Sequence, residues 1–336
     1  MGGPTLPDAD LDALYRRELR PVLHRFARDG RARLGQVLRW GGILAALGAI
    51  ASMILYNVFP GSMAPLVPAI GVGLFMVIGY ARAHSGYRAE FKERVIRPII
   101  AHFDPGLSYT PHASISRAEF DASDLFRSDI DRFRGEDLIS GSVGETRIRF
   151  SELHVEDRQQ SGSGKNRRTE WVTVFKGVFV IADFPKQFRG RTVVLPDTAQ
   201  RFFGGIGQAL QSMNFARGQL VKLEDPEFER LFVVYADDQV EARYLLSTSL
   251  MQRVMDFRRK WNHDLYLSFA RSQLFMALPS GRNLLEPPPL VQLLSYGRAP
   301  ATEEAVVKRI AEYVADLNLV LGIVDDLNLN RRIWVR

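Results

Sequence analysis

Two long apolar stretches in the amino-terminal third of the chain predict a helical hairpin. No charged residue occurs in the 42 positions from Trp40 to Ala81. The first stretch, residues 40–59, has 20 residues, and a helix of that length reaches about 30 Å, the thickness of the hydrocarbon core of a bilayer. The second, residues 63–81, has 19 residues. Pro60-Gly61-Ser62 between them has the composition of a tight turn, so we expect a transmembrane hairpin with these two spans.

The chief alternative is a pair of core helices in a soluble protein. It is disfavoured because one face of such a helix normally meets water, whereas neither stretch carries a charge. Small residues recur at four-residue spacing and predict close approach of helix backbones. Two arrangements stay open for them, packing of the hairpin on itself and oligomerisation between chains. These residues are Gly41, Ala45 and Ala49 in the first stretch and Ala69 and Gly73 in the second.

Amphipathic helices are predicted on both sides of the hairpin. Apolar positions recur at helical spacing over residues 11–26, and again over residues 87–103 until Asp104-Pro105-Gly106 ends the pattern. The two helices either pack on each other as a stalk or lie flat on anionic headgroups. The apolar positions are Leu11, Leu14, Tyr15, Leu19, Val22, Leu23 and Phe26 upstream, and Tyr87, Phe91, Val95, Ile99 and Phe103 downstream.

Positive charge is concentrated beside the apolar stretches. Residues 1–103 carry 13 Lys and Arg against 7 Asp and Glu, a balance of +6, whereas residues 104–336 carry 31 of each kind. Because the basic residues flank the hairpin and its turn carries no charge, the positive-inside rule predicts that both termini are cytoplasmic. The neutral downstream region gives little reason to expect nucleic-acid binding. The chain has no cysteine, which excludes disulfides and fits a reducing compartment.

Downstream of residue 104 the pattern changes to strands mixed with helices. Residues 145–157 alternate and then slip by one position between Phe150 and Leu153, which predicts a strand with a β-bulge. Residues 171–184 are β-branched and aromatic enough for a central strand. Further strands are expected at 191–197, around Leu220, around Phe232 and on both sides of a turn at Arg271-Ser272, and further helices from Asp197 or Thr198 to Met213, near Ser247 and from Thr302 to Leu321.

This order of elements predicts an α+β fold. We expect an N-terminal two-helix transmembrane hairpin with a helical stalk, followed by a mixed, mostly antiparallel cytoplasmic α+β domain. The predicted boundary separates residues 1–103 from residues 104–336, and the second part offers two candidate subdomains, 104–215 and 216–336.

Four blocks of the chain resemble a known family. They read "FRGEDLISGSVGETRIRFSELHVED", "VFKGVFVIADFPKQFRGRTVVLPD", "LEDPEFERLFVVYADDQVEARYLLSTSLMQRV" and "GIVDDLNLNRRIW". In these blocks and in its two-span hairpin, the chain resembles a bacterial membrane-protein family catalogued as domain of unknown function 3137. The resemblance implies a location in the bacterial inner membrane, and no reaction, cofactor or catalytic residue. It points to a LemA-like membrane protein as a partner.

No complete cofactor or metal motif accompanies these blocks. "SGSGK" at 161–165 resembles a phosphate-binding loop, but Gln159 and Asn166 stand where that motif needs Gly and Ser or Thr, so we interpret it as a hairpin loop. "FFGGIGQAL" at 202–210 lacks a preceding strand of the dinucleotide-binding type, and we interpret its glycines as helix packing. The six histidines are scattered without metal-ligand spacing. We therefore predict neither a cofactor nor a metal.

Acidic residues form three candidate clusters: Glu224, Asp225, Glu227 and Glu229; Asp237, Asp238 and Glu241; and Asp325 with Asp326. The candidate site residues among them are Glu224, Asp225, Asp237 and Asp238. Paired carboxylates can bind a hard cation or transfer protons. The alternative, which we favour, is structural: a helix start at Asp225-Pro226 and a turn at Asp237-Asp238.

Basic residues form candidate contacts to anionic lipid, each worth about 1 kcal/mol near the surface. Their alternative is a solvated surface balanced by acids. The candidates are Lys165, Arg167, Arg168, Lys186, Arg189 and Arg191, with Arg258, Arg259 and Lys260 as a further group.

The expected function is that of a membrane-anchored, cytoplasm-facing binding or scaffold module, as a homo-oligomer or with a protein partner. One alternative is a membrane-bound hydrolase or nucleotide-dependent enzyme that uses the acidic clusters. The other is a module that binds anionic lipid headgroups.

Overall fold

The computed structural model describes residues 9–161, 168–197, 218–327 and 329. The chain divides into two compact units: residues 1–99 with 285–314, and residues 100–284 with 315–336. The first break, after residue 99, lies close to the one predicted after residue 103. Residues 285–314 fold with the amino-terminal helices, although the sequence placed them in the downstream domain.

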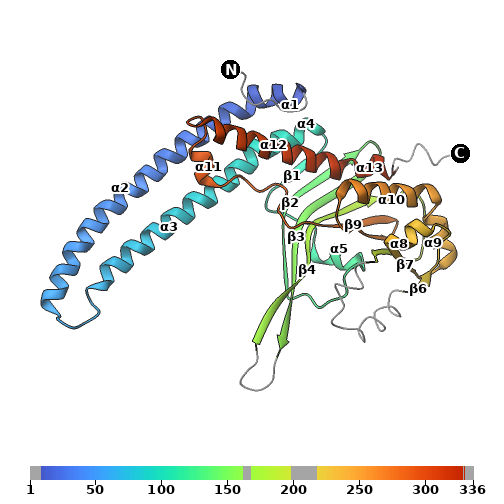
Figure 1. Ribbon diagram of the computed structural model, residues 1–336, viewed down its shortest axis with the longest axis horizontal. Coiled ribbons are helices and arrows are strands. Elements are labelled where there is room, and N and C mark those ends of the chain that lie inside the picture. The colour runs from blue at the N-terminus through green and yellow to red at the C-terminus, as the bar shows by residue number, and fades with distance from the viewer. Residues whose placement is uncertain (1–8, 162–167, 198–217, 328, 330–336) are drawn as a thin grey trace. The chain divides into compact units, whose positions relative to one another are not determined.

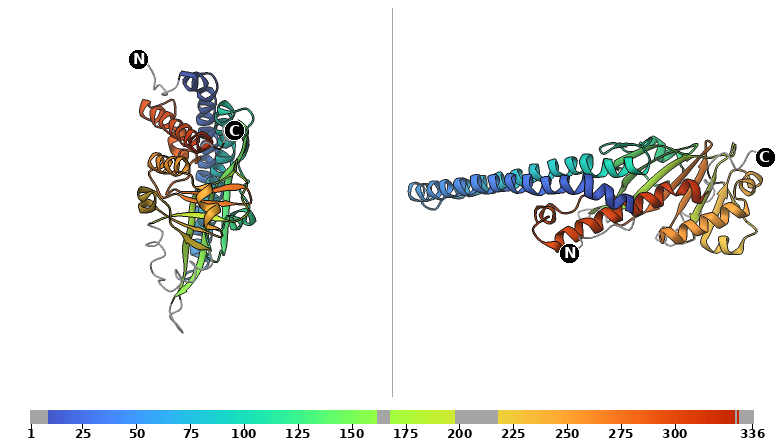
Figure 2. Two further views of the ribbon diagram at one scale, coloured as in Figure 1. Left: turned by 90° about the vertical axis from the view of Figure 1, so that its right-hand side faces the viewer. Right: turned by 90° about the horizontal axis from the view of Figure 1, so that it is seen from above.

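The first unit contains two long antiparallel helices. The first is continuous through α1 (Ala9–Leu14), a π-helical segment (Tyr15–Leu19) and α2 (Arg20–Val58). The second runs through α3 (Leu66–Phe91), a π-helical segment (Lys92–Ile96) and α4 (Arg97–Phe103), of which the last residues belong to the second unit. α2 and α3 lie side by side (Figures 1 and 2). The turn between them includes Gly61 with φ of 82°, a conformation that glycine adopts without strain.

Of the five small residues predicted for the contact between α2 and α3, only Gly41 takes part, and it is joined by Gly48, which was not predicted. Gly41 faces Met76, and Gly48 faces Val72 and Pro68. Ala45, Ala49, Ala69 and Gly73 are exposed instead. A helix has 3.6 residues per turn, so a strict four-residue stripe drifts off the contact, and the observed positions alternate between steps of three and four.

Most side chains of the two amphipathic stripes, from Tyr15 to Phe26 and from Tyr87 to Ile99, are buried in the first unit, where the stripes pack on each other. The ring of Phe26 lies 6.4 Å from that of Tyr87 and 6.3 Å from that of Phe91. Residues 285–314, which include α11 (Leu290–Leu294) and the start of α12 (Pro300–Leu321), complete this packing. The arrangement is that of the stalk, because apolar side chains that lay flat on headgroups would not be covered by one another.

The second unit is built on one nine-stranded sheet whose ladders are all antiparallel in the described residues. The order across the sheet is β1-β2-β3-β4-β9-β8-β5-β7-β6. Strands from 104–215 and from 216–336 alternate in it, so the described chain does not separate into those two subdomains. The strands are β1 (Ser108–Thr110), β2 (Arg132–Val143), β3 (Thr146–Ser161), β4 (Arg168–Asp183), β5 (Thr192–Pro196), β6 (Gln219–Val221), β7 (Phe232–Ala236), β8 (Tyr266–Ala270) and β9 (Gln273–Pro279).

Helices cover both faces of the sheet (Figures 1 and 2). On one face, Phe120 of α5 (Arg117–Ala122) belongs to a buried cluster with Phe179 and Phe275. On the other face lies α10 (Thr248–Trp261), together with α8 (Pro226–Leu231) and α13 (Ile323–Asp326). α9 (Gln239–Leu245) contacts the edge strand β6. Since successive residues of a strand point to opposite faces, the central strands are buried on both sides and read as continuous apolar runs.

The pattern slip in residues 145–157 has a different cause from the predicted bulge. The ladder between β3 and β4 is continuous from Ile148 to Val155, so β3 is regular there. The buried side chains of β3 lie on one face of the sheet up to Phe150 and on the opposite face from Ser151 onward, because a different face of the strand is covered in each part. One bulge lies on β2, between Glu136 and Ile139, where Asp137 adopts φ of 63°. The β3–β4 ladder shifts its register further along, between Val155 and Glu156.

Several local predictions are confirmed. β4 is central, between β3 and β9. The turn between β8 and β9 has φ of 55° at Arg271 and 59° at Ser272, as a type I′ hairpin requires. Ser247 precedes α10, and α12 contains the helix predicted from Thr302 to Leu321. The helix predicted up to Met213 lies outside the described residues.

Candidate functional site

The hairpin carries an unusual amount of exposed apolar surface. Among the described residues, all but five of the large exposed apolar side chains lie between Leu38 and Tyr80. Met53 is 71 % exposed and Ile70 is 67 % exposed. Both helices are long and apolar enough to cross a membrane, and almost none of their apolar cores is buried within the protein. Contiguous exposed apolar surface of this kind marks an interface with a membrane or another apolar partner.

The predicted basic candidates do not form one surface. Lys165 and Arg167 lie outside the described residues, and Arg168 is the first residue of β4. Lys186 is buried, its ammonium donates a hydrogen bond of 2.7 Å to the Tyr244 carbonyl, and burial lowers the pKa of Lys186. Arg189 is exposed.

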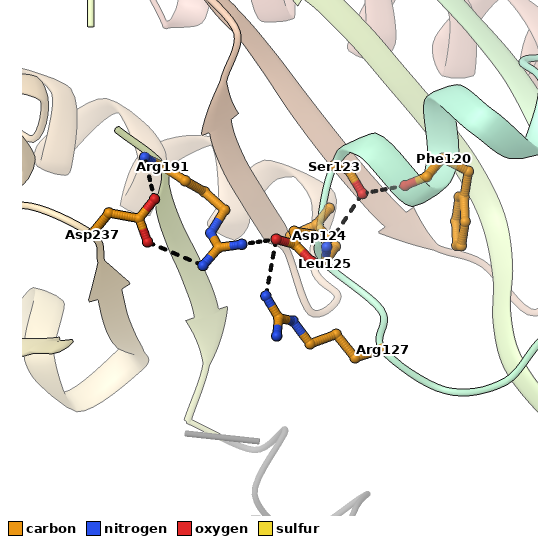
Figure 3. Close-up of polar contacts among 7 residues, drawn as sticks. All are labelled: Phe120, Ser123, Asp124, Leu125, Arg127, Arg191 and Asp237. Atoms are coloured by element: carbon orange, nitrogen blue, oxygen red, sulfur yellow. Dashed lines mark hydrogen bonds and ion pairs between the residues drawn. The ribbon is translucent and has the colours of Figure 1, made fainter. Parts of the chain in front are cut away.

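Arg191 lies between two carboxylates (Figure 3). Its guanidinium pairs with Asp124 and, at 3.1 Å, with Asp237, whose other oxygen accepts the Arg191 backbone N–H. Asp124 also accepts a 2.9 Å hydrogen bond from Arg127. This network therefore engages one lipid candidate, Arg191, and one acidic candidate, Asp237, in joining β5 to the loop after α5.

The remaining group, Arg258, Arg259 and Lys260, ends α10 and makes ion pairs with nearby acids. Arg259 pairs with Asp256 at 2.5 Å and with Glu227 at 2.9 Å. Lys260 pairs with Asp326 at 2.5 Å. These charges are balanced within the second unit.

Two of the four acidic candidates, Asp225 and Asp238, serve as helix caps. Asp225 caps α8 by accepting the backbone N–H groups of Glu227 at 2.9 Å and Phe228 at 3.1 Å. Asp238 caps α9 in the same way, through the first residues of that helix. Glu224 is exposed. Across the described residues, no three His, Asp or Glu side chains are placed to hold a metal ion.

A polar pocket of about 410 Å³ in the second unit was missed by sequence reasoning. Its floor is the sheet face formed by β2, β3 and β4, and its rim is the loop after β9. The charged and histidine side chains that line it are Arg134, Glu136, Glu152, His154, Lys176 and Arg282, with His112 beside them.

Three basic side chains stand in one row across this floor. His154 on β3 lies directly opposite Arg134 on β2 and directly opposite Lys176 on β4. The carboxylate of Glu156 lies 3.9 Å from both Arg134 and His154. Lys176 makes no ion pair with any described residue. Arg134 and Lys176 therefore present positive charge that the surrounding side chains do not fully neutralise, and the His154 imidazole between them can also form a hydrogen bond.

The next row of the floor is acidic. Glu136 on β2 lies directly opposite Glu152 on β3. Glu152 accepts a hydrogen bond of 2.5 Å from the backbone N–H of Leu284, which fixes the rim. Arg282 on the rim is held by Asp316 at 2.7 Å. The pocket thus has a basic half and an acidic half, and both are anchored to regular structure.

Gly177 sets the junction between the floor and the rim. Its φ is 149°, and a Cβ there would overlap the Leu278 carbonyl oxygen and come within 2.8 Å of the Ser280 backbone nitrogen. Only glycine lets β4 and β9 approach in this way. The Ser280 N–H donates to the Lys176 carbonyl at 3.0 Å, so the glycine also fixes the backbone of Lys176.

Comparison with known proteins finds one matching family model, and its description names no activity. Residues 173–329 match the family model described as "Protein of unknown function (DUF3137)". The match includes Lys176, Gly177 and the rim of the pocket, and leaves out the hairpin and the block at 133–157. No curated protein and no solved structure matches the chain.

Proposed function

We propose that this chain, whose residues 173–329 match the family described as protein of unknown function (DUF3137), is a membrane-anchored binding module. The family description names no reaction. In this proposal α2 and α3 span a bilayer, in a bacterium the inner membrane, and the sheet of the second unit presents the binding surface. The observation that carries the proposal is the exposed apolar surface between Leu38 and Tyr80.

The energetics of that surface favour a bilayer as its environment. Covering a large apolar side chain is worth about 1.5–3 kcal/mol, and the hairpin exposes such side chains around both helices. In water this surface would drive aggregation. Both helices satisfy their backbone hydrogen bonds internally, as a spanning element must.

The charges at the ends of the helices support an orientation. Arg39 precedes the apolar part of α2, Arg82 follows that of α3, and the tip between them has no charge. The positive-inside rule then places both termini and the second unit in the cytoplasm. Oligomerisation in the membrane and a LemA-like partner belong to the proposal only as candidates.

The two alternatives receive less support. An enzyme that used the acidic clusters would need those carboxylates free, and Asp225, Asp237 and Asp238 make caps and an ion pair instead. A lipid-binding surface would need the basic candidates on one face, and Lys186 is buried while Arg191 is paired. The binding surface is better sought in the polar pocket.

Because the chain has no cysteine, single introduced cysteines can report the membrane anchor and its orientation without background labelling. We would introduce Ser62→Cys at the tip and, in a separate variant, Ser142→Cys at an exposed position of β2, and treat intact bacterial cells with a membrane-impermeant maleimide. We expect labelling at 62 in intact cells and labelling at 142 only after permeabilisation. The reversed pattern would overturn the orientation. Release of the full chain from membranes by alkaline carbonate would overturn the anchor.

A further inference from the structure

We propose that the polar pocket binds a phosphorylated small molecule, with Arg134, His154 and Lys176 holding its phosphate group. This inference deepens the proposed function, because it names the ligand class of the binding module and rests on that module existing. It is drawn from the register of three strands and from the distribution of charge on their exposed face.

The geometry of the row suits a phosphate. Side chains directly opposite each other on neighbouring strands have Cβ atoms about 4.5–5.5 Å apart, so Arg134, His154 and Lys176 reach over one small area of the floor. A phosphate has at least three oxygens that accept charge-assisted hydrogen bonds, and it can meet donors from three directions. A single carboxylate, with two oxygens in a plane, fits such a row less well.

The electrostatics point the same way. Arg134 and Lys176 lie on either side of His154 in this row, so two cations share one small area, and an anion bound between them would relieve their repulsion. Some basic side chains of the second unit are paired, as Arg191 is between Asp124 and Asp237. In the pocket, the Arg134 side chain is 63 % exposed and lies 3.9 Å from the Glu156 carboxylate, and Lys176 makes no ion pair with a described residue.

The size and the acidic half of the pocket indicate the chemistry of the rest of the ligand. Its volume of about 410 Å³ is far larger than a phosphate needs and lies within the range typical of small-molecule sites. Glu136 and Glu152 lie one row away from the bases. Carboxylates accept hydrogen bonds and donate none, so the body of the ligand carries hydroxyl or amino groups. A soluble phosphate ester and a phospholipid headgroup share this chemistry.

The test uses the full chain in phosphatidylcholine nanodiscs, with inorganic phosphate and glycerol 3-phosphate as probes and glycerol as the control. Binding of the two phosphate probes is measured by broadening of their phosphorus resonance, and binding of all three compounds is measured by the rise of Tm. We expect both phosphate probes to bind and glycerol not to bind. Loss of one hydrogen bond to a charged group lowers affinity about tenfold or more. We therefore expect Lys176→Gln to weaken phosphate binding by that factor.

Matched variants separate a binding role from a folding role. Arg134→Gln changes an exposed side chain of the row and should weaken binding with little change in the Tm of the unliganded protein. Lys222→Gln, an exposed lysine of the same unit outside the pocket, should bind like the original chain. Equal binding by Lys176→Gln and Lys222→Gln, or no binding of either probe to the original chain, would overturn the proposal.

Two further measurements show whether the ligand is a lipid headgroup or a soluble ester, and whether a negative result concerns the pocket or the membrane anchor. Repeating the titration in nanodiscs that contain phosphatidate distinguishes the two sources: lost binding of soluble probe assigns the pocket to a headgroup, and unchanged binding assigns it to a soluble ester. Carbonate extraction of the same variants reports anchoring separately. Absent phosphate binding with an intact anchor therefore refutes the pocket and leaves the anchor standing.

Discussion

Tyr15 and Tyr296 share a hydrogen bond of 2.7 Å between their hydroxyl groups, although 281 positions separate them in the chain. Both side chains are buried. Burial raises the pKa of Tyr15 and of Tyr296, so both hydroxyls stay protonated and one can donate to the other. This pair fastens the segment after α11 to the amino-terminal helix within the first unit.

Tyr15→Phe and Tyr296→Phe should each destabilise the first unit, because each leaves the other hydroxyl buried without this partner. The expected cost is about 1–3 kcal/mol for each single change. The double replacement should cost less than the sum of the two, since it removes both polar groups together. Thermal unfolding in detergent, followed by tryptophan fluorescence, measures all three. Strict additivity would show that the hydroxyls do not depend on each other.

Gly48→Leu should separate α2 from α3, whereas Gly73→Leu should be tolerated. A Cβ at 48 would already contact Val72 at 3.4 Å, so a larger side chain has no room, while nothing lies within 4 Å of a Cβ at 73. Both changes add the same apolar group, so they affect membrane insertion equally. Overpacking of this kind costs about 1–3 kcal/mol.

Contact between the helices can be measured directly in membranes. Val37 Cγ1 lies 3.2 Å from the place of a Cβ at Gly79, so cysteines introduced at 37 and 79 should form a disulfide on oxidation. We expect Gly48→Leu to reduce that cross-link and Gly73→Leu to leave it unchanged. The opposite result would restore the four-residue stripe that includes Gly73.

Features determined by short segments were predictable from the sequence. The apolar length of 40–81, the β-branched run of β4 and the turn at Arg271-Ser272 each depend on neighbouring residues alone. The Asp225-Pro226 helix start is of the same kind, because a cap needs only the next few N–H groups.

Features determined by distant segments were not predictable. Nothing near Tyr296 indicates that its partner is Tyr15, so residues 285–314 were assigned to the wrong neighbours. The pocket depends on which residue of β3 faces which residue of β4. A shift of one position would move Lys176 away from His154 and onto the other face, and a single sequence does not specify that register.

Gly177→Ala should strongly destabilise the second unit. Its φ of 149° is unfavourable for any residue with a side chain, and the added Cβ would overlap the backbone of β9. The two effects together should cost about 3 kcal/mol or more. Gly281→Ala is the control, because nothing lies within 4 Å of a Cβ there. Equal melting temperatures for the two variants would contradict the geometry at the floor of the pocket.

Glu119 should give part of the protein's stability a dependence on pH. Partial burial raises the pKa of Glu119, but hydrogen bonds from Ser116 and the ion pair with Arg149 at 2.5 Å outweigh it, so the pKa lies below its usual value. The stabilisation is therefore complete above about pH 4.3, the unfolded pKa of a glutamate, and is lost as the pH falls through the lower folded pKa.

The measurement for Glu119 is a set of melting curves from neutral to acid pH. Glu119→Gln should have a lower Tm than the original chain at neutral pH, and the difference should shrink on acidification below about pH 4. Glu170→Gln, at an exposed position of β4, serves as the control and should show no such convergence. A difference that is independent of pH would mean that the ionised carboxylate is not what stabilises the cap.

Asp225→Ala and Asp238→Ala should each lower the melting temperature of the second unit, because each removes a helix cap. Loss of an N-cap costs about 1 kcal/mol, which corresponds to about 2–4 °C for a unit of this size. Glu224→Ala is the matched control, since Glu224 is exposed next to Asp225 and caps nothing. The same three variants decide between the structural and the enzymatic interpretation of these acids. If Asp225→Ala or Asp238→Ala abolished a cellular phenotype while Tm stayed that of the original chain, the carboxylate would be acting on a ligand and not on its helix.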